Sequence, residues 1–398
     1  MTHHHYALKY DREGFFKTAF LEIAMSDGSP ALLYAIVAFA AYHHTVGQNN
    51  DDISTFLSYY NQSIAFLQQS LQKERHSIAT LLTTLQLATI EEFLGDLVNL
   101  LDHRRAAYEI FKELFTPQTI LHDETSRMIL IWYLRFQLFA GMIPRGETIL
   151  DRQWLAASAE FHNRQLEHKP EDLGAQFESY FATSRLLATD VAILFAGKVN
   201  RTISDEKFVA GIKLLSKELA EFGYTIEKAF VDTSRFPTED LVTMNFVLIE
   251  HMAIDLMFKY QLAISAGHPP LPELAQIAIK QARLFDTIQY SHEKVENAVL
   301  SCRTSLGTIS LFLPREERYN LWCRRKYARI EQLGCIYPEI FRKRMGDAWS
   351  EDVSRWWLPN DEGYPATIRA IREFVQYRAT LQIPGRHNVS NVSGISEQ

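Results

Sequence analysis

The chain has 398 residues, of which 47% are hydrophobic and 22% are charged, and its formal net charge is −7. These proportions are ordinary for a soluble globular protein with a sizeable core, and the negative balance gives no overall attraction to nucleic acid. Three scattered cysteines are too few for a disulfide framework or a four-thiolate zinc site, so we expect buried thiols.

No apolar run predicts a membrane span. The longest run, Ala31 to Ala41, falls well short of the roughly 20 residues that a spanning helix needs. The first residues also lack the basic and apolar regions of a secretory signal peptide. We therefore expect an intracellular, soluble protein without a membrane partner.

The N-terminal part begins with polar residues and continues with two apolar helices. We expect residues 1–10 to be a flexible arm, in which His3 to His5 could bind a metal but are better explained as a frayed end. Residues 11–24 place apolar side chains on one helical face. The next helix, Ala31 to Val46, is apolar nearly all round, which is typical of a buried helix with close neighbours.

The stretch from His76 to Phe115 predicts two packed helices around which the rest of the chain is organised. Apolar residues recur at helical spacing on both sides of an interruption at Gly95 and Asp96. Gly95 can adopt the left-handed conformation that ends a helix, and Asp96 can accept hydrogen bonds from the first amides of the next one. A hairpin with one apolar seam is not stable alone, so other helices must cover it.

Four segments in this half carry a resemblance to a known family. In chain order they are Phe16 to His43, Tyr59 to Leu67, Ala79 to Asp96, and Asp102 to Ala107. Their succession resembles the regulatory domain, or middle homology region, of fungal transcription factors of the binuclear zinc cluster type. The resemblance implies an all-helical domain of a nuclear regulator that is controlled by a small-molecule effector or by another protein.

One feature of that family is missing from the sequence. The family's DNA-binding module carries six closely spaced cysteines upstream, whereas this chain begins directly with the helical region. Either the module is left out of this sequence, or the protein is a relative that never had it. We therefore expect DNA contact only through a module outside this chain, zinc only in such a module, and transcriptional machinery or regulatory proteins as partners.

The rest of the sequence also predicts helices, and no stretch has the alternating pattern of a strand. The clearest break is Gly267 to Pro272, where consecutive prolines forbid helix. We predict an all-α fold, with a single large domain of packed antiparallel helices over residues 11–383, a candidate subdivision near 267–272 and a disordered tail over 384–398. Helices are expected over residues 126–142, 154–167, 170–195, 204–222, 241–266, 273–290 and 295–312, with another after Pro314.

Two charged residues interrupt strongly apolar helices. Arg135 shares a helix face with Trp132 and Phe136, and Asp190 lies within the run Leu186 to Phe195. A buried charge without a partner is costly, so each residue needs an opposite charge or a ligand unless it is exposed. A structural ion pair is favoured, and simple exposure and ligand recognition remain as alternatives.

A second group of polar residues lies on the helix expected over 241–266. His251, Asp255 and Lys259 recur every four residues, so their side chains form a ladder on one face. A helix-stabilising ladder is favoured over a metal site, which would need further ligands from elsewhere in the fold. If a cavity lies among the long apolar helices, Arg135, Asp190, His251 and Asp255 are candidates for its polar contacts.

The basic residues concentrate near the C-terminal end. Arg324, Arg325, Lys326 and Arg329 form a candidate basic patch that could act as a nuclear import signal or contact phosphate. Nearby glutamates dilute the charge, so a salt-bridged helix face is favoured. Trp349, Trp356 and Trp357 follow, and packing explains them better than a partner site does.

The sequence lacks the common catalytic motifs. It has no H-E-x-x-H, no G-x-x-x-x-G-K-[ST], no G-x-S-x-G and no G-x-G-x-x-G, and the D-D-x-x-D of helical terpene synthases is also missing. We therefore expect a protein that is not an enzyme. The leading hypothesis is a transcription-factor regulatory domain, the second is a helical interaction scaffold or co-regulator without a DNA-binding module, and the third is a cofactor-free helical enzyme.

Overall fold

The computed structural model describes residues 2–26, 30–73, 75–136, 150–230, 237–269, 272–290 and 297–381. Within these ranges the chain forms fifteen α-helices and no strand, so the predicted all-α fold is confirmed. The expected tail over 384–398 lies outside the described residues, as does the end of the helix expected over 126–142.

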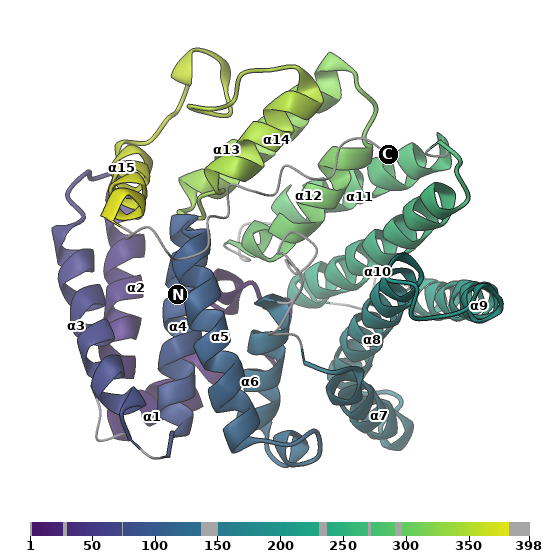
Figure 1. Cartoon of the computed structure of the whole chain (residues 1–398), viewed down its shortest axis with the longest axis horizontal. Coiled ribbons are helices and arrows are strands. Elements are labelled where there is room, and N and C mark those ends of the chain that lie inside the picture. The colour runs from purple at the N-terminus through teal and green to yellow at the C-terminus, as the bar shows by residue number, and fades with distance from the viewer. Residues whose placement is uncertain are drawn as a thin grey trace.

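The N-terminal half is a layer of helices built around one central helix. In Figure 1, α2, α3, α4 and α5 stand side by side, and α4 packs against the other three. Every residue of α4 from Ala79 to Leu94 is buried. The helices of this half are α1 (Ala19–Ser26), α2 (Ala31–Gln48), α3 (Ser54–Leu71), α4 (Ile78–Leu94), α5 (Leu97–Leu114) and α6 (Glu124–Arg135).

The predicted helical hairpin is confirmed at its caps. Gly95 ends α4 with φ 74°, and the Asp96 carboxylate accepts a hydrogen bond from the Asn99 amide at 3.2 Å. The Ile336 amide donates to the Phe93 carbonyl at 2.8 Å, so a distant segment lies directly against the turn. A Cβ atom added at Gly95 would lie 3.0 Å from the Ile336 carbonyl oxygen.

Gly95→Ala is therefore expected to lower the free energy of unfolding by roughly 1–2 kcal/mol, because the left-handed backbone disfavours a Cβ atom. Gly307 in α12 (Arg303–Phe312) is the matched control, since a Cβ atom there would meet nothing within 4 Å. Gly307→Ala should raise the free energy of unfolding by roughly 0.5–1 kcal/mol. Urea denaturation followed by circular dichroism measures both, and equal effects would contradict the assignment of Gly95 as the turn.

The second half curls away from this layer and then returns to it. Figure 1 shows α7 to α10 on the right, α13 and α14 along the top, and α15 back beside α2. The α-helices are α7 (Arg152–His168), α8 (Leu173–Val199), α9 (Asp205–Ala229), α10 (Thr238–Ser265), α11 (Pro272–Tyr290), α12, α13 (Glu317–Gln332), α14 (Glu339–Trp349) and α15 (Ala366–Leu381). Short 3-10 helices are η1 (His3–Tyr6), η2 (Phe15–Lys17), η3 (Thr119–Leu121), η6 (Ala298–Cys302) and η7 (Pro359–Asp361).

The hydrophobic side chains form a main core and a smaller cluster, here called the satellite core. The main core runs through both halves of the chain, from Tyr6 to Ile371. The helices α8, α9 and α10 alone form the satellite core, from Leu187, Val191, Phe195, Phe208, Leu215, Leu219, Ile254 and Phe258. The same three helices also contribute buried residues to the main core, so they join the two cores.

The subdivision expected near 267–272 stays a prediction. The helices α10 and α11 pack against each other on either side of this break. The side-chain amide of Gln281, which is fully buried, donates to the Ile249 carbonyl at 3.1 Å. The main core includes buried residues of both helices, such as Val247 of α10 and Phe285 of α11.

Helix α10 is long and apolar. By length and composition it is the one helix in the described ranges that could cross a bilayer, with a mean hydropathy of 1.5 over its most apolar window. Val242 and Phe246 pack in the main core, and Ile254 and Phe258 pack in the satellite core. Its apolar surface is thus explained by packing on two sides.

The N-terminal segment differs from the expected flexible arm. His4 and Tyr6 are 4% and 1% exposed, and the Tyr6 ring stacks on Phe16 with centroids 3.7 Å apart. His4 Nδ1 lies 2.9 Å from the Ser301 hydroxyl, which ties the segment to η6. The polar appearance of residues 3–5 was misleading because Tyr6 and Leu8 provide the apolar contacts that hold this segment in the main core.

Candidate functional site

The structure does not bring the predicted polar residues together. Arg135 lies inside the main core at the end of α6, and Asp190 lies on α8 beside α7. His251 and Asp255 share a face of α10 near α9. Each location therefore has its own chemistry.

Arg135 belongs to a buried triad with Glu92 and Arg303. One Glu92 oxygen lies 2.9 Å from Arg135 Nη2, and the other lies 2.5 Å from Arg303 Nη2. All three side chains are less than a tenth exposed. Arg135 also donates to the Thr89 hydroxyl at 2.8 Å. The favoured prediction, a structural ion pair, thus describes Arg135 correctly.

Electrostatics and burial compete in this triad. Burial lowers the pKa of Arg135 to about 10, although Glu92 opposes that shift. Burial also disfavours the charged form of Glu92, but the attraction of Arg135 and Arg303 outweighs it and holds the pKa of Glu92 below its usual value. The triad therefore stays ionised, and removing one member would leave a charge in the core.

Asp190 makes a surface ion pair. Its carboxylate accepts from Nε and Nη2 of Arg152 on α7, the second bond being 2.8 Å long. The Asp190 and Arg152 side chains are 17% and 51% exposed, so solvent screens the pair. Asp190 therefore links α7 to α8. It is not among the residues that line the two clefts described below.

A second buried network was missed in the sequence. Both oxygens of Glu91 accept hydrogen bonds from Arg378 of α15 at 3.1 Å, and the Tyr60 hydroxyl donates to the same carboxylate. Burial raises the pKa of Glu91 to about 7, against the pull of Arg378. The adjacent pair Glu91 and Glu92 within an otherwise apolar helix was the available signal for both networks.

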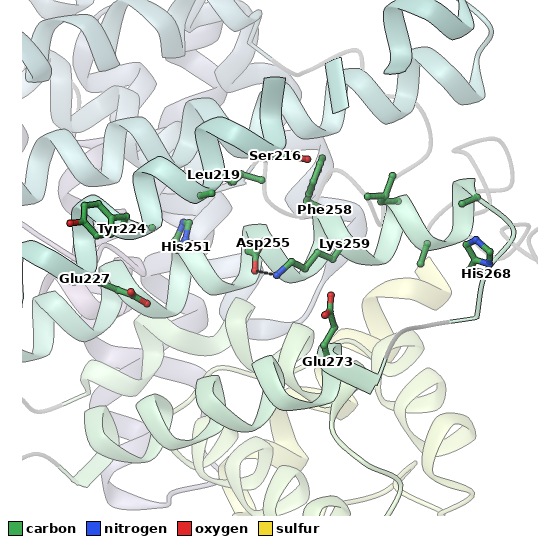
Figure 2. Close-up of a pocket in the computed structure, with 15 residues that line it drawn as sticks. Ser216, Leu219, Tyr224, Glu227, His251, Asp255, Phe258, Lys259, His268 and Glu273 are labelled. Carbon is green, nitrogen blue, oxygen red and sulfur yellow. Dashed lines mark hydrogen bonds and ion pairs between the residues drawn. The ribbon is translucent and has the colours of Figure 1, made fainter. Parts of the chain in front are cut away.

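His251 and Asp255 lie in a groove that runs along α10 between α9 and the start of α11, as Figure 2 shows. The groove has a volume of about 670 Å³. It is here called the α9–α10 groove, and its lining residues are Ser216, Leu219, Ala220, Gly223, Tyr224, Glu227, His251, Asp255, Phe258, Lys259, Leu262, Ala263, Ala266, His268 and Glu273. It exists because α9 packs mainly on α8 and leaves part of α10 uncovered.

The groove has an apolar floor and a polar rim. Leu219 and Phe258 are buried members of the satellite core that face it, and Ala263 is also buried. Asp255 accepts a hydrogen bond from Lys259 at 2.8 Å, so the predicted ladder is confirmed at this pair. In Figure 2, Glu227 lies toward one end of the groove and Glu273 toward the other.

His251 of α10 lies against Gly223 of α9. A Cβ atom at Gly223 would lie 2.6 Å from His251 Nε2, so only glycine allows the ring to approach α9 this closely. The ring also makes an edge contact with Phe222, with centroids 5.5 Å apart. Burial lowers the pKa of His251, so its imidazole is neutral at pH 7.

A second cleft, of about 290 Å³, is polar and largely self-neutralised. It lies near Arg12, Glu124, His162 and Asp172. Arg12 donates to Asp172 at 2.9 Å, which closes one side of the cleft with an ion pair. The α9–α10 groove is larger and more apolar, so it is the better candidate for a ligand site.

Comparison with known families assigns the N-terminal part of this fold. Residues 7–186 match the family described as Fungal specific transcription factor domain. This N-terminal region, which is less than half of the chain, is similar to a fungal specific transcription factor domain. The four segments that resembled this family lie within the matched residues, and the family is one of transcription regulators. No curated protein and no solved structure matches the chain.

The match places the candidate site relative to the family region. The fungal transcription factor domain, as matched, ends within α8. The α9–α10 groove begins at Ser216, which lies after that end. The family match therefore does not cover the residues that line the groove. The buried networks of Glu91 and Glu92 lie inside the matched part and hold the later helices α12 and α15 to it.

The candidate basic patch is divided by the structure. Arg325 and Arg329 are exposed, but Arg324 and Lys326 are 8% and 4% exposed. Arg324 donates to the Trp357 carbonyl at 2.6 Å, and Lys326 pairs with Asp286 at 2.5 Å. The four residues therefore do not form one continuous basic surface, and the ion pairs of Arg324 with Glu351 and of Lys326 with Asp286 fit the favoured alternative, a salt-bridged helix face.

The tryptophans near this region are packed. Trp349, Trp356 and Trp357 are all less than a tenth exposed, as expected for packing rather than for a partner site. The three cysteines are buried free thiols, which confirms that part of the prediction. In the described ranges, no group of three His, Cys, Asp or Glu side chains is placed to hold a metal ion.

Proposed function

We propose that this chain is the regulatory domain of a fungal transcription regulator and that a small-molecule effector controls it from the α9–α10 groove. The family match supports the regulatory role. The groove is the observation that carries the effector site, because its volume of about 670 Å³ lies within the range of small-molecule pockets, roughly 300–1,000 Å³. An apolar floor with a few polar groups is the usual composition of such sites.

The position of the groove suggests how binding alters the domain. Helix α9 contributes three of its four buried residues to the satellite core, whereas most of the buried residues of α10 lie in the main core. A ligand that touches both helices favours the spacing at which its contacts are best, and it shifts the population toward that arrangement. The satellite core then moves relative to the main core, and regulatory proteins or the transcription machinery respond to the change.

DNA contact in this proposal is made by a module outside this chain or by an associated protein. The negative net charge and the division of the basic patch both argue against direct contact by the domain itself. The domain needs no cofactor of its own, and the nucleus is the place where it acts.

A reporter fusion tests this function. The chain is joined to a heterologous DNA-binding module, and transcription is measured in a panel of carbon and nitrogen sources. Ala220→Trp fills the groove from α9, and Ala210→Trp places the same side chain on an exposed part of α9 outside the groove. We expect medium-dependent activity from the wild type and from Ala210→Trp, and constant activity from Ala220→Trp.

Two results would overturn the proposal. A reporter that is indifferent to the fusion in every medium would remove the regulatory role. If the Ala220→Trp and Ala210→Trp fusions respond equally to the medium, the groove is not the effector site. That result would favour a scaffold that acts through another surface. Comparable melting temperatures of the two variants establish that neither effect comes from unfolding.

A further inference from the structure

The charges around the α9–α10 groove point to an amphipathic organic cation as its ligand. We infer that the groove binds a molecule with an apolar body and a protonated amine. The biological meaning of this ligand rests on the proposed effector function, whereas its binding does not. Three observations on the groove support the inference.

The first is the apolar floor. Leu219 and Phe258 are 3% and 4% exposed, and they form the bottom of the groove together with Leu262 and Ala263. A hydrocarbon chain lying here removes apolar surface from water on both sides, which contributes about 0.8 kcal/mol for each buried CH₂ group. The body of the ligand is therefore an alkyl or aryl group.

The second is the excess of negative charge. The lining contains three carboxylates, Glu227, Asp255 and Glu273, and one ammonium group, Lys259. Lys259 is already engaged by Asp255 at 2.8 Å. Among the described residues, neither Glu227 nor Glu273 forms an ion pair with another side chain, so both carboxylates are available to a cation in the groove.

The third is the state of His251, one of the two histidines of the lining. His251 is neutral at pH 7 because burial lowers its pKa, and it does not compensate the carboxylates. The three carboxylates and the one lysine of the lining together carry two more negative than positive charges. A carboxylate or phosphate ligand would be repelled, and a neutral ligand would leave the rim charges unused.

Matched probes separate these classes. Octylammonium, octanol and octanoate share one apolar body and differ in charge, and each is titrated against the full chain at pH 7 in a thermal-shift assay. We expect octylammonium to raise the melting temperature with an apparent Kd at least about tenfold below that of octanol, and we expect no shift with octanoate. Added salt should weaken octylammonium binding and leave octanol binding nearly unchanged.

Two double variants test the residues. Glu227→Gln with Glu273→Gln should reduce octylammonium affinity to that of octanol and leave octanol affinity unchanged. Glu22→Gln with Glu109→Gln removes the same charge from exposed positions outside the groove, and it should change neither affinity. Ala220→Trp should abolish binding of both probes.

Several outcomes would overturn the inference. Equal shifts from the three probes would show an apolar groove without charge selection, and a preference for octanoate would reverse the sign. No shift from any probe would remove the small-molecule site and favour a partner helix as the occupant. If octylammonium binds as expected but Ala220→Trp leaves the reporter response intact, the ligand class stands and the effector function fails.

Discussion

Glu92→Gln is expected to lower the free energy of unfolding by roughly 3–5 kcal/mol, the largest effect of any single substitution proposed for this protein. The substitution keeps the side-chain volume but removes the only carboxylate of the buried triad. Arg135 and Arg303 would then face each other as buried cations without compensation. A loss of this size is a large part of the 5–15 kcal/mol that typically stabilises a domain. Chemical denaturation of the purified chain measures it.

Two comparison variants test whether the loss of stability comes from the buried charges. Glu160→Gln breaks the ion pair with Arg164, whose partners are both more than 60% exposed, and should change stability by no more than about 0.5 kcal/mol. Replacing Arg135, Glu92 and Arg303 together by methionine removes all three charges and should recover most of the loss. If Glu92→Gln were as mild as Glu160→Gln, the triad would not be a buried ionised network.

Acidification from pH 7 to pH 5 is expected to destabilise the protein by several kcal/mol. Burial lowers the pKa of His4 to about 3 and the pKa values of His5, His103 and His162 to about 4. An unfolded histidine has a pKa of about 6.5, so below that pH the unfolded chain binds protons that the folded chain does not. Each of these groups then costs about 2 kcal/mol of stability at pH 5.

Glu91 acts in the opposite direction. In the folded protein its pKa is about 7, which is above the value in the unfolded chain. Glu91 therefore stabilises the folded state below the unfolded pKa, and this stabilisation is lost as the pH rises toward 7. Between pH 7 and pH 5, protonation of Glu91 stabilises the folded state by about 2 kcal/mol, which offsets the effect of about one histidine. The destabilisation by the four histidines is therefore still the larger effect. The expected net result is a midpoint of urea denaturation that falls steadily below pH 6.5.

Single histidine variants identify the groups responsible. His4→Asn keeps a hydrogen-bonding group near Ser301 but cannot bind a proton, so the fall between pH 7 and pH 5 should shrink by about 2 kcal/mol. His44→Asn makes the same substitution at an exposed histidine of α2 and serves as the control. A pH profile that His4→Asn does not change would mean that the N-terminal segment is not packed in the core.

The local parts of the fold could be predicted from the sequence because their causes are local. Apolar residues at helical spacing identified the helices, and Gly95 and Asp96 identified the turn between α4 and α5. Both signals depend on backbone geometry within a few residues. The nearly all-round apolar composition of residues 31–46 likewise predicted a buried helix, and α2 packs in the main core.

Partners that are distant in sequence could not be predicted in the same way. Arg135 needed an opposite charge, but nothing near it identified Glu92 as the partner or Arg303 as the third member. Similarly, Glu91 is held by Arg378, which lies 287 residues later in the chain. Such pairs depend on which helices become neighbours, and periodicity within one helix does not contain that information.

Helical periodicity within the basic run distinguishes its exposed residues from its buried ones. Arg325 and Arg329 are four residues apart and share the exposed face of α13. Arg324 is adjacent to the buried Cys323 and points toward the packed side, where it meets the Trp357 carbonyl. The α9–α10 groove had no comparable signal, since it arises from the way α9 rests on α8.

Hydrogen exchange with and without octylammonium tests most directly whether a ligand in the groove couples α9 to α10. At a saturating concentration of octylammonium, the account predicts slower exchange in α9 and in the part of α10 from His251 to Ser265, with unchanged exchange in α4. Ala220→Trp should show no difference on addition of the probe. A wild-type chain that binds octylammonium without any change in α9, or with an equal change in every helix, would contradict the account.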